Sequence, residues 1–311
     1  MSKIAFLFSG QGAQYPGMMK DLYDTIPESK HVFDIADTVL GRSISALCFE
    51  GTQEELNLTH NTQPCMLAAD LAAYAAVSSA GVKPDAMAGF SLGEYAALVA
   101  AGVIDIKDAF RIIQIRADAM QEAVPVGKGA MAAVMKLDGD TVEALCKEVG
   151  GYVVPANYNC PGQIVVSGEA DAVDRLLAIT KERKIRAMKL SVSAPFHCDM
   201  MKPAVNVLKE ALDRTVLRDV QYGVYMNVDG NMEHDSARIR EKLLQQTYSP
   251  VLWEQTLRNM SEDGINVFVE LGVGKTLTSF IKKTLPEAIV VHIEDMTTLH
   301  EIVEGGIVVN E

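Results

Sequence analysis

The sequence predicts an α/β fold built on a mostly parallel sheet, and three observations support this prediction. Short apolar runs typical of buried strands alternate with helix-forming stretches along most of the chain. The 311 residues are 49% apolar and 22% charged, which provides for a sizeable core and excludes a disordered chain. In the middle, five short elements follow one another within about 65 residues, which indicates a small α+β unit inserted into the larger one.

The elements of the larger unit follow from its apolar runs and turn signals. A glycine-rich turn ends the first strand, and Thr62 and Pro64 are start signals for the first long helix. Gly102 is a stop signal for a second helix, which follows a serine turn flanked by glycines. The expected strands cover 4–8, 86–88, 267–269 and 289–291, and the expected helices cover 66–77 and 94–101.

The middle segment has a different texture and is expected to form a subdomain of its own. Its elements are expected in the order strand, helix, strand, helix, strand, over 130–135, 140–149, 164–167, 171–183 and 186–192. The large α/β subdomain then comprises 1–126 and 194–311, and the small α+β subdomain is inserted at 127–193.

The charge balance and the cysteines limit the partners and the compartment. With 28 Lys and Arg against 41 Asp and Glu, the formal net charge is −13, which argues against nucleic acid as a partner. The five cysteines are an odd number without C-x-x-C spacing, so we expect free thiols in a reducing cytosol and no metal site. The first apolar run is too short for a signal peptide and none is long enough to span a membrane. We therefore expect a cytoplasmic protein.

One five-residue pattern carries the strongest chemical signal. Gly89-Phe90-Ser91-Leu92-Gly93 is a G-x-S-x-G between an expected strand and an expected helix. Such an elbow is crowded and needs small residues on both sides, and it presents the serine hydroxyl at a helix N-terminus. Backbone N–H groups at that terminus can stabilise an oxyanion. We therefore interpret Ser91 as a nucleophile, against the alternative of a glycine-rich turn that happens to hold a serine.

A nucleophilic serine needs a base, and the residues alone leave the choice open. Of six histidines, His197 has the most suitable context, an irregular proline-containing loop after an expected strand. Its neighbour Cys198 is a weaker candidate for a nucleophile, because adjacent side chains usually point apart.

Two other glycine patterns resemble nucleotide-binding motifs and fail on inspection. Gly10-Gln11-Gly12 follows a strand, but Tyr15 stands where G-x-G-x-x-G needs its third glycine. Gly274-Lys275-Thr276 resembles the end of a P-loop, but Val269 stands where the first glycine is needed. Both are better interpreted as tight turns, the first with N–H groups that can face a ligand.

Seven motifs together resemble a known family. They are Gly10-Gln11-Gly12-Ala13-Gln14, Thr62-Gln63-Pro64, Gly89-Phe90-Ser91-Leu92-Gly93-Glu94, Gln121-Glu122-Ala123-Val124-Pro125, Asn157-x-Asn159-x-Pro161-x-Gln163-x-Val165-x-Ser167-Gly168, Ser193-x-Pro195-x-His197-Cys198 and Glu270-Leu271-Gly272-x-Gly274-Lys275. The series spans nearly the whole chain and resembles the malonyl-CoA:acyl carrier protein transacylases. The resemblance implies an α/β-hydrolase-like large subdomain with an inserted ferredoxin-like small subdomain.

The resemblance also implies a ping-pong mechanism without a cofactor. Ser91 attacks the malonyl-CoA thioester to form a malonyl ester, and the phosphopantetheine thiol of acyl carrier protein collects the malonyl group. His197 matches the base, and the backbone carbonyl of Gln246 matches the group that orients its imidazole. The backbone N–H groups of Gln11 and Leu92 match the oxyanion hole.

Three further positions bear on the acyl group. Arg116 matches the arginine that holds the free carboxylate of malonyl, which a guanidinium can grip through two hydrogen bonds. Phe90 departs from the family, which usually has histidine there, and puts the choice of extender group in doubt. Phe196 fits the malonyl-type pattern, so we expect a preference for malonyl over methylmalonyl.

The partners implied are malonyl-CoA and acyl carrier protein, with no nucleic acid, membrane or metal, and we expect a monomer. Arg183, Lys184, Arg186 and Lys189 form a basic cluster that is either a solvated face or a docking site for the carrier or for CoA phosphates. Three alternatives are a serine thioesterase or hydrolase, a stand-alone acyltransferase of a polyketide synthase, and a non-enzymatic scaffold. The hydrolase gives Arg116 no role.

Overall fold

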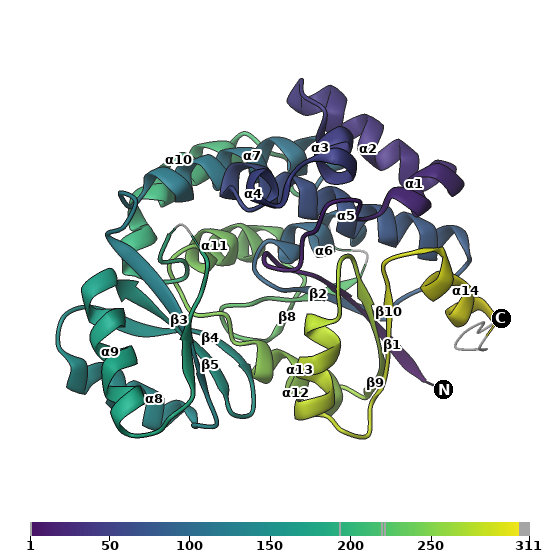
Figure 1. Ribbon diagram of the computed structural model, residues 1–311. Coiled ribbons are helices and arrows are strands. Elements are labelled where there is room, and N and C mark those ends of the chain that lie inside the picture. The colour runs from purple at the N-terminus through teal and green to yellow at the C-terminus, as the bar shows by residue number, and fades with distance from the viewer. Residues whose placement is uncertain (1, 193, 219, 221, 305–311) are drawn as a thin grey trace.

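Two β-sheets organise the chain in the computed structural model, which describes residues 2–192, 194–218, 220 and 222–304 (Figure 1). The larger sheet is mixed and has six strands in the order β10-β9-β1-β2-β7-β8. Its neighbours are parallel except for the antiparallel pair β7 and β8. Its strands are β1 Lys3–Phe8, β2 Ala86–Gly89, β7 Gly223–Tyr225, β8 Met232–Glu233, β9 Ile265–Leu271 and β10 Ile289–Ile293. The predicted α/β fold with a mostly parallel sheet is confirmed.

Helices cover both faces of this sheet, which explains why its central strands are continuously apolar. In β1, Phe6 and Phe8 face the core formed with α5 and α6, whereas Ala5 and Leu7 face the core formed with α12 and α13. The helices are α1 Lys20–Thr25, α2 Pro27–Leu40, α3 Ile44–Glu50, α4 Gln53–Leu56, α5 Thr59–Ser79, α6 Gly93–Ala100, α7 Ile106–Glu122, α8 Gly139–Val149, α9 Ala170–Glu182, α10 Lys202–Asp213, α11 Ser236–Gln246, α12 Trp253–Glu262, α13 Thr276–Thr284 and α14 Met296–Glu304, with a 3₁₀ turn at Asp199–Met201.

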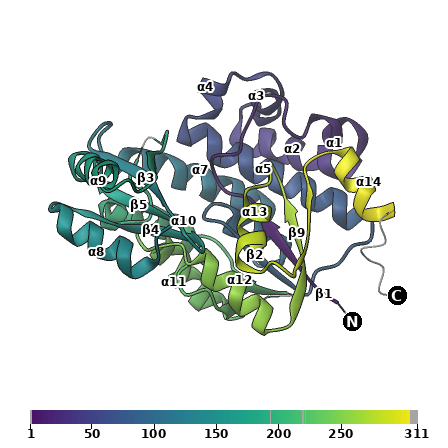
Figure 2. The ribbon, with the colours of Figure 1, turned by 60° about the horizontal axis from the view of Figure 1, so that its bottom comes forward.

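The smaller sheet lies to one side of the molecule with α8 and α9, far from α14 (Figures 1 and 2). Its four strands are antiparallel, in the order β4-β5-β3-β6, and are β3 Gly129–Met135, β4 Val153–Cys160, β5 Gln163–Glu169 and β6 Ala187–Lys189. In β3, Ala132 and Val134 face α8 and α9, whereas Met131 and Ala133 face Met120 on α7. This second face therefore joins the small sheet to the rest of the chain.

The predicted order of the middle segment was wrong by one strand, because β4 was missed. The observed order is strand, helix, strand, strand, helix, strand. Pro155, Asn157 and Asn159 interrupt the apolar alternation of β4, and Pro155 falls at an irregularity in its pairing with β5. The last strand, β6, is also shorter than the predicted 186–192. Ser193, where the predicted boundary falls, lies outside the described residues.

The start predicted for the first long helix was also wrong. α5 begins at Thr59 rather than at 66, and Pro64 lies inside it. A proline has no N–H, so the carbonyl of His60, four residues earlier, receives no helical hydrogen bond. Arg42 donates to that carbonyl at 2.8 Å and Gln114 donates to it at 3.3 Å. Side chains thus replace the missing bond, and the helix continues through Pro64.

The other predicted elements of the large unit are confirmed within a few residues, as strands β1, β2, β9 and β10 and helix α6. Gly102 follows α6 with a φ of 77°, as a helix stop requires. Within the described ranges, no helix is both long and apolar enough to cross a membrane.

Candidate active site

The predicted serine elbow lies where β2 ends and α6 begins. Ser91 has a φ of 55°, a left-handed conformation that a non-glycine residue seldom adopts. A Cβ on Gly89 would lie 1.9 Å from the backbone of Gly93, and a Cβ on Gly93 would lie 2.4 Å from the carbonyl oxygen of Phe8. Both glycines of the pattern are therefore required by close backbone approach. The turn places the serine hydroxyl at the N-terminus of α6.

The structure brings Ser91 and His197 together, although they are 106 residues apart in sequence. Ser91 Oγ lies 2.7 Å from His197 Nε2, and His197 Nδ1 lies 2.9 Å from the carbonyl oxygen of Gln246. Because a carbonyl only accepts, Nδ1 carries the proton and Nε2 is free to accept the proton of Ser91. The geometry is that of a nucleophile and base in which a carbonyl replaces the usual carboxylate.

His197 is buried in a positively charged surrounding, and both conditions favour its neutral form. Burial, and to a smaller extent the nearby charge of Arg116, lower the pKa of His197 to about 4. Hydrogen bonds to the backbone of Gln246 and Ser249 oppose the shift. At neutral pH the imidazole is therefore ready to accept a proton.

Arg116 on α7 is 1% exposed, and its guanidinium reaches Ser91. One terminal nitrogen donates to Gln63 Oε1 at 2.7 Å, and the other donates to Gln246 Oε1 at 3.0 Å and to Ser91 Oγ at 3.3 Å. The guanidinium also lies over the ring of Tyr95, 5.5 Å from its centroid. Its hydrogen-bond partners are thus neutral amides and a hydroxyl, which leaves a buried positive charge beside the nucleophile.

Gln11 and Leu92 line the same cavity as Ser91, and each has a backbone N–H group. Neither of them donates to an acceptor in the part of the chain that the structure describes. Two unpaired N–H donors next to a nucleophilic serine can bind a developing oxyanion.

The cavity has a volume of about 190 Å³ and lies between the large sheet and the small one. Phe90 and Phe196 both line it, on either side of the Ser91–His197 pair. The Phe90 ring contacts Trp253 edge-on, with centroids 5.4 Å apart, and lies 6.1 Å from the ring of Phe280. The apolar wall is therefore continuous with the core beneath α12 and α13. Further lining residues are Ala13, Gln63, Met120, Met131, Asn157, Asn159, Val165, Leu190, Val192 and Leu277.

Sequence reasoning missed the residue that holds the elbow in place, Asn227. Its Oδ1 accepts from the Ser91 N–H at 2.7 Å and its Nδ2 donates to the Gly89 carbonyl at 2.7 Å. Its own N–H donates to Glu94 Oε2 at 2.6 Å, while Gln246 Nε2 donates to Glu94 Oε1 at 3.0 Å and to the Ser91 carbonyl at 2.8 Å. The strained residue is thus held at both its N–H and its carbonyl. A single asparagine outside any motif gives no signal in the sequence.

Glu94 joins the two supporting amides and is fully buried. Burial raises the pKa of Glu94 to about 8, although hydrogen bonds from Asn227 and Gln246 and the charge of Arg116 oppose the shift. Glu94 makes no contact with the nucleophile's hydroxyl, so its role is to connect the groups around the elbow.

Cys198 was the weaker candidate for a nucleophile, and its surroundings do not suit that role. Cys198 is buried, donates to the carbonyl of Pro195 at 3.1 Å, and has a pKa raised by burial, none of which suits a nucleophile. All five cysteines are free and buried. No group of three potential metal ligands is found among the described residues.

The basic cluster is partly neutralised by neighbouring acids. Arg183 forms an ion pair with Glu148, and Lys189 forms one with Asp174 at 2.6 Å. Lys184 and Arg186 are exposed and form no ion pair with any described residue. The cluster therefore keeps two uncompensated charges of the four predicted to act in docking.

Comparisons with known proteins show the family of this chain. Residues 5–302 match the acyl transferase domain family. The chain is 44% identical over 303 residues to the malonyl CoA-acyl carrier protein transacylase of Bacillus subtilis, covering 96% of each protein. It is 42% identical over 287 residues to the malonyl CoA-acyl carrier protein transacylase of Escherichia coli, covering 91% of this chain and 93% of that one.

Two solved structures resemble this chain both in fold and in sequence. A malonyl-transacylase in complex with its type II polyketide synthase acyl-carrier protein, PlMCAT:AntF, matches with a TM-score of 0.95 and 40% identity, covering 98% of this chain and 100% of that one. An acyl carrier protein S-malonyltransferase from Vibrio cholerae matches with a TM-score of 0.93 and 40% identity, covering 97% and 100%.

Proposed function

This chain belongs to the acyl transferase family, and we propose that Ser91 and His197 carry out its reaction as nucleophile and base. The enzyme is a malonyltransferase, which moves a malonyl group from coenzyme A to the phosphopantetheine thiol of acyl carrier protein. In this role it supplies fatty acid biosynthesis, and the route is ping-pong, through an enzyme-bound malonyl ester.

Each half-reaction uses the same two groups. Ser91 Oγ attacks the thioester carbonyl carbon while His197 Nε2 accepts the hydroxyl proton. The carbonyl oxygen, now negative, is held by the N–H groups of Gln11 and Leu92 until the carbon–sulfur bond breaks. His197 then gives its proton to the departing CoA thiolate. The carrier thiol reverses these steps, losing its proton to His197 and displacing Ser91 from the ester.

The observation that carries the preference for malonyl is the environment of Arg116. Its partners are neutral, so the carboxylate of a malonyl group supplies the missing counter-charge, and acetyl or long acyl groups do not. Phe90 and Phe196 both line the same cavity, and Phe196 fits the malonyl-type pattern. We expect kcat/KM for methylmalonyl-CoA to be well below that for malonyl-CoA, and comparable values would contradict this preference.

Intact-mass spectrometry after rapid mixing with malonyl-CoA tests the nucleophile. We expect one malonyl group on the wild-type protein and none on Ser91→Ala, and the absence of a wild-type adduct under rapid quench would overturn the mechanism. Adding the carrier protein separates transfer from hydrolysis, because a transferase yields malonyl-carrier and a thioesterase yields free malonate.

Arg116→Ala tests the selectivity. We expect malonylation of this variant to slow by roughly a hundredfold or more, because a buried charge-assisted pair is lost, whereas acetylation from acetyl-CoA changes little. Equal losses for both acyl groups would show that Arg116 acts on the serine and not on the substrate.

The finer description of the fold and partners is also a proposal. We describe 1–126 and 194–311 as an α/β-hydrolase-like subdomain and the inserted 127–193 as ferredoxin-like, which the β-α-β-β-α-β order of the small sheet supports. The enzyme acts on its substrates as a cytoplasmic monomer without a cofactor. A polyketide carrier is the alternative acceptor, favoured by the likeness to the malonyl-transacylase of a type II polyketide synthase.

A further inference from the structure

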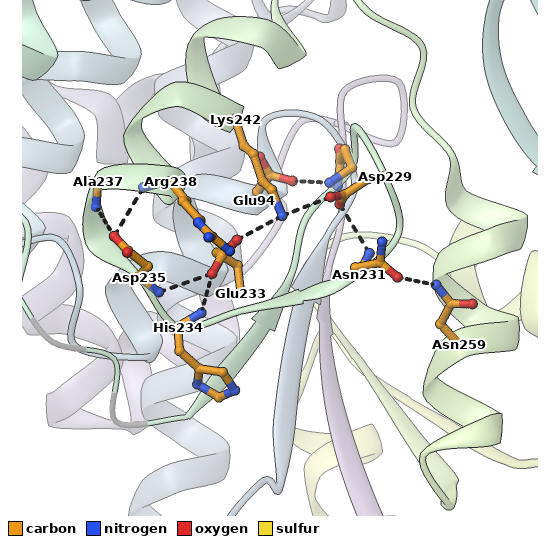
Figure 3. Close-up of polar contacts among 11 residues, drawn as sticks. Glu94, Asp229, Asn231, Glu233, His234, Asp235, Ala237, Arg238, Lys242 and Asn259 are labelled. Carbon is orange, nitrogen blue, oxygen red and sulfur yellow. Dashed lines mark hydrogen bonds and ion pairs between the residues drawn. The ribbon is translucent and has the colours of Figure 1, made fainter.

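Three charged side chains outside the cavity form a compact ion-pair group. Lys242 on α11 places its Nζ 2.8 Å from Asp229 Oδ2 and 3.0 Å from Glu233 Oε2 (Figure 3). Both acids belong to the hairpin of β7 and β8, Asp229 to its turn and Glu233 to its second strand. Among the described residues of α11, Lys242 is the one that forms ion pairs with this hairpin.

Two of the three side chains are more buried than those of an ordinary surface ion pair, and the third, Asp229, is 38% exposed. The Lys242 side chain is 17% exposed and that of Glu233 is 11% exposed, whereas the exposed Lys20–Asp24 pair has about half of each side chain in solvent. Burial by itself would raise the pKa of Glu233, but hydrogen bonds from Lys242 and from two backbone N–H groups bring it down to about 2. Both members are therefore charged at neutral pH, and the pair is less screened by water than exposed pairs are.

Each side of this ion-pair group carries one of the two amides that hold the elbow. Two residues before Asp229, the hairpin carries Asn227, which binds the N–H of Ser91. One helical turn after Lys242, α11 ends with Gln246, which binds the carbonyl of Ser91 and orients His197. The distance between hairpin and helix therefore sets the distance between the two supports of the nucleophile.

We propose that Lys242 is a positioning residue for acyl transfer, which holds the β7–β8 hairpin against α11 so that Asn227 and Gln246 fix Ser91 and His197 in their reactive arrangement. Lys242 lines no part of the described cavity and touches no reacting atom. It acts along two paths. One runs through its ion pair with Asp229 and back along the chain to Asn227, and the other runs along α11 to Gln246. The inference rests on the proposed roles of Ser91 and His197.

The hairpin's other anchor shows why this contact matters. Asn259 on α12 donates to the carbonyl of Gly230 at 2.8 Å and to Asn231 Oδ1 at 3.1 Å (Figure 3). That anchor holds the tip of the turn. Glu94 joins Asn227 to Gln246 beside the elbow, and Lys242 is the charged contact that holds the hairpin against α11 farther from it. A displacement of about 1 Å between reacting groups can cost about a hundredfold in rate, so a small relaxation here is measurable.

The test compares Lys242→Met, which keeps most of the aliphatic stem, with Lys242→Arg, which keeps the charge. We expect kcat and the single-turnover rate of Ser91 malonylation to fall roughly tenfold or more in Lys242→Met, while KM for malonyl-CoA changes less than twofold. Lys242→Arg should restore most of the rate. The matched control is Lys20→Met, which removes an exposed ion pair and should change neither quantity.

A second variant separates positioning from folding, because Lys242→Met leaves Glu233 unpaired and can lower stability. Lys242→Met/Glu233→Gln removes the lysine and its more buried partner and leaves only Asp229, which is 38% exposed to solvent. Its thermal midpoint is measured beside its rate. A slow but stably folded double variant supports positioning. Wild-type kcat in either variant, or a loss that follows the unfolded fraction alone, overturns it. Wild-type protein that forms no malonyl adduct would instead refute the proposed function.

Discussion

At the scale of single residues, neutral amide groups hold two residues whose backbone conformation is strained. Ser91 and His197 both have positive φ, of 55° and 58°, and both are fixed by hydrogen bonds to Gln246. The elbow motif, a local pattern, singled out the serine, whereas the residues alone left the histidine open and His197 was assigned from the resemblance to the transacylases. Asn227 was missed because its function depends on two strands that meet only in the folded sheet.

The pH dependence of acylation follows from the environment of His197. Its pKa is lowered from the ordinary value of 6.5 to about 4 by burial and by Arg116. The base must be neutral, so the rate is retained while pH falls through 6.5 and is lost only as pH approaches 4. We expect the single-turnover malonylation rate at saturating substrate to vary less than twofold between pH 5.5 and 7.5.

The control for this profile is the folded fraction, followed by circular dichroism at each pH. The native state favours neutral His197, so this residue's contribution to stability is complete above pH 6.5 and is lost as pH falls toward 4. A rate that halves near pH 6.5 in fully folded protein would contradict the assignment of a buried, depressed imidazole.

At the scale of elements, the strands predicted in the large sheet, β1, β2, β9 and β10, were those with continuous apolar runs, and the short strands β7 and β8 were missed. Strands β1 and β9 contribute buried residues to the cores on both faces of the sheet, so their apolar runs can be recognised without knowledge of a partner strand. In strand β4, Asn157 and Asn159 line the cavity and Pro155 lies at an irregularity in the pairing with β5, and these three residues hide the strand in the sequence. In β4, the need for polar residues in the cavity wall therefore outweighs the preference of strands for β-branched and aromatic residues.

Helix α5 shows the same conflict, and Arg42 resolves it. Besides the His60 carbonyl, Arg42 donates to Asn61 Oδ1 at 2.6 Å and to Gln114 Oε1 at 2.8 Å. Arg42→Met should lower the free energy of unfolding by about 1–2 kcal/mol, because partly buried acceptors in the Pro64 turn lose their donor. Urea denaturation measures this, with Arg111→Met, which breaks the exposed pair with Asp108, as the control.

In the Arg42 variant we also expect malonylation to be retained at low urea concentration, since Arg42 lies away from the cavity lining. A loss of stability no larger than that of Arg111→Met would mean that Gln114 alone supports the helix at Pro64.

At the scale of the whole molecule, the two sheets enclose a cavity whose chemistry is opposite in sign to the protein's net charge. The chain carries 28 − 41 = −13, yet the cation Arg116 lines the cavity. Net charge argues against nucleic acid as a partner only as an average over the surface. We expect an anionic substrate or partner to be attracted by local departures from that average.

The basic cluster is a local excess of positive charge close to the cavity, because β6 leads directly to the lining residues Leu190 and Val192. Paired cations contribute little at a distance, because each acid cancels the field of its partner within a few ångströms. Arg183 and Lys189 are paired in this way, so we expect Lys184 and Arg186 to provide the attraction.

Reversing the charge of these two residues is therefore the test. We expect Lys184→Glu/Arg186→Glu to raise KM for the carrier protein several-fold at low ionic strength and to flatten its dependence on salt, because screening acts on the charges that were removed. The rate of Ser91 malonylation at saturating malonyl-CoA should not change, since neither residue lines the cavity. Lys20→Glu/Lys30→Glu, at paired sites on α1 and α2, matches the change in net charge and should leave carrier KM nearly unchanged. Equal effects of the two double variants would show that the carrier responds to net charge alone, and the cluster would then be a solvated face.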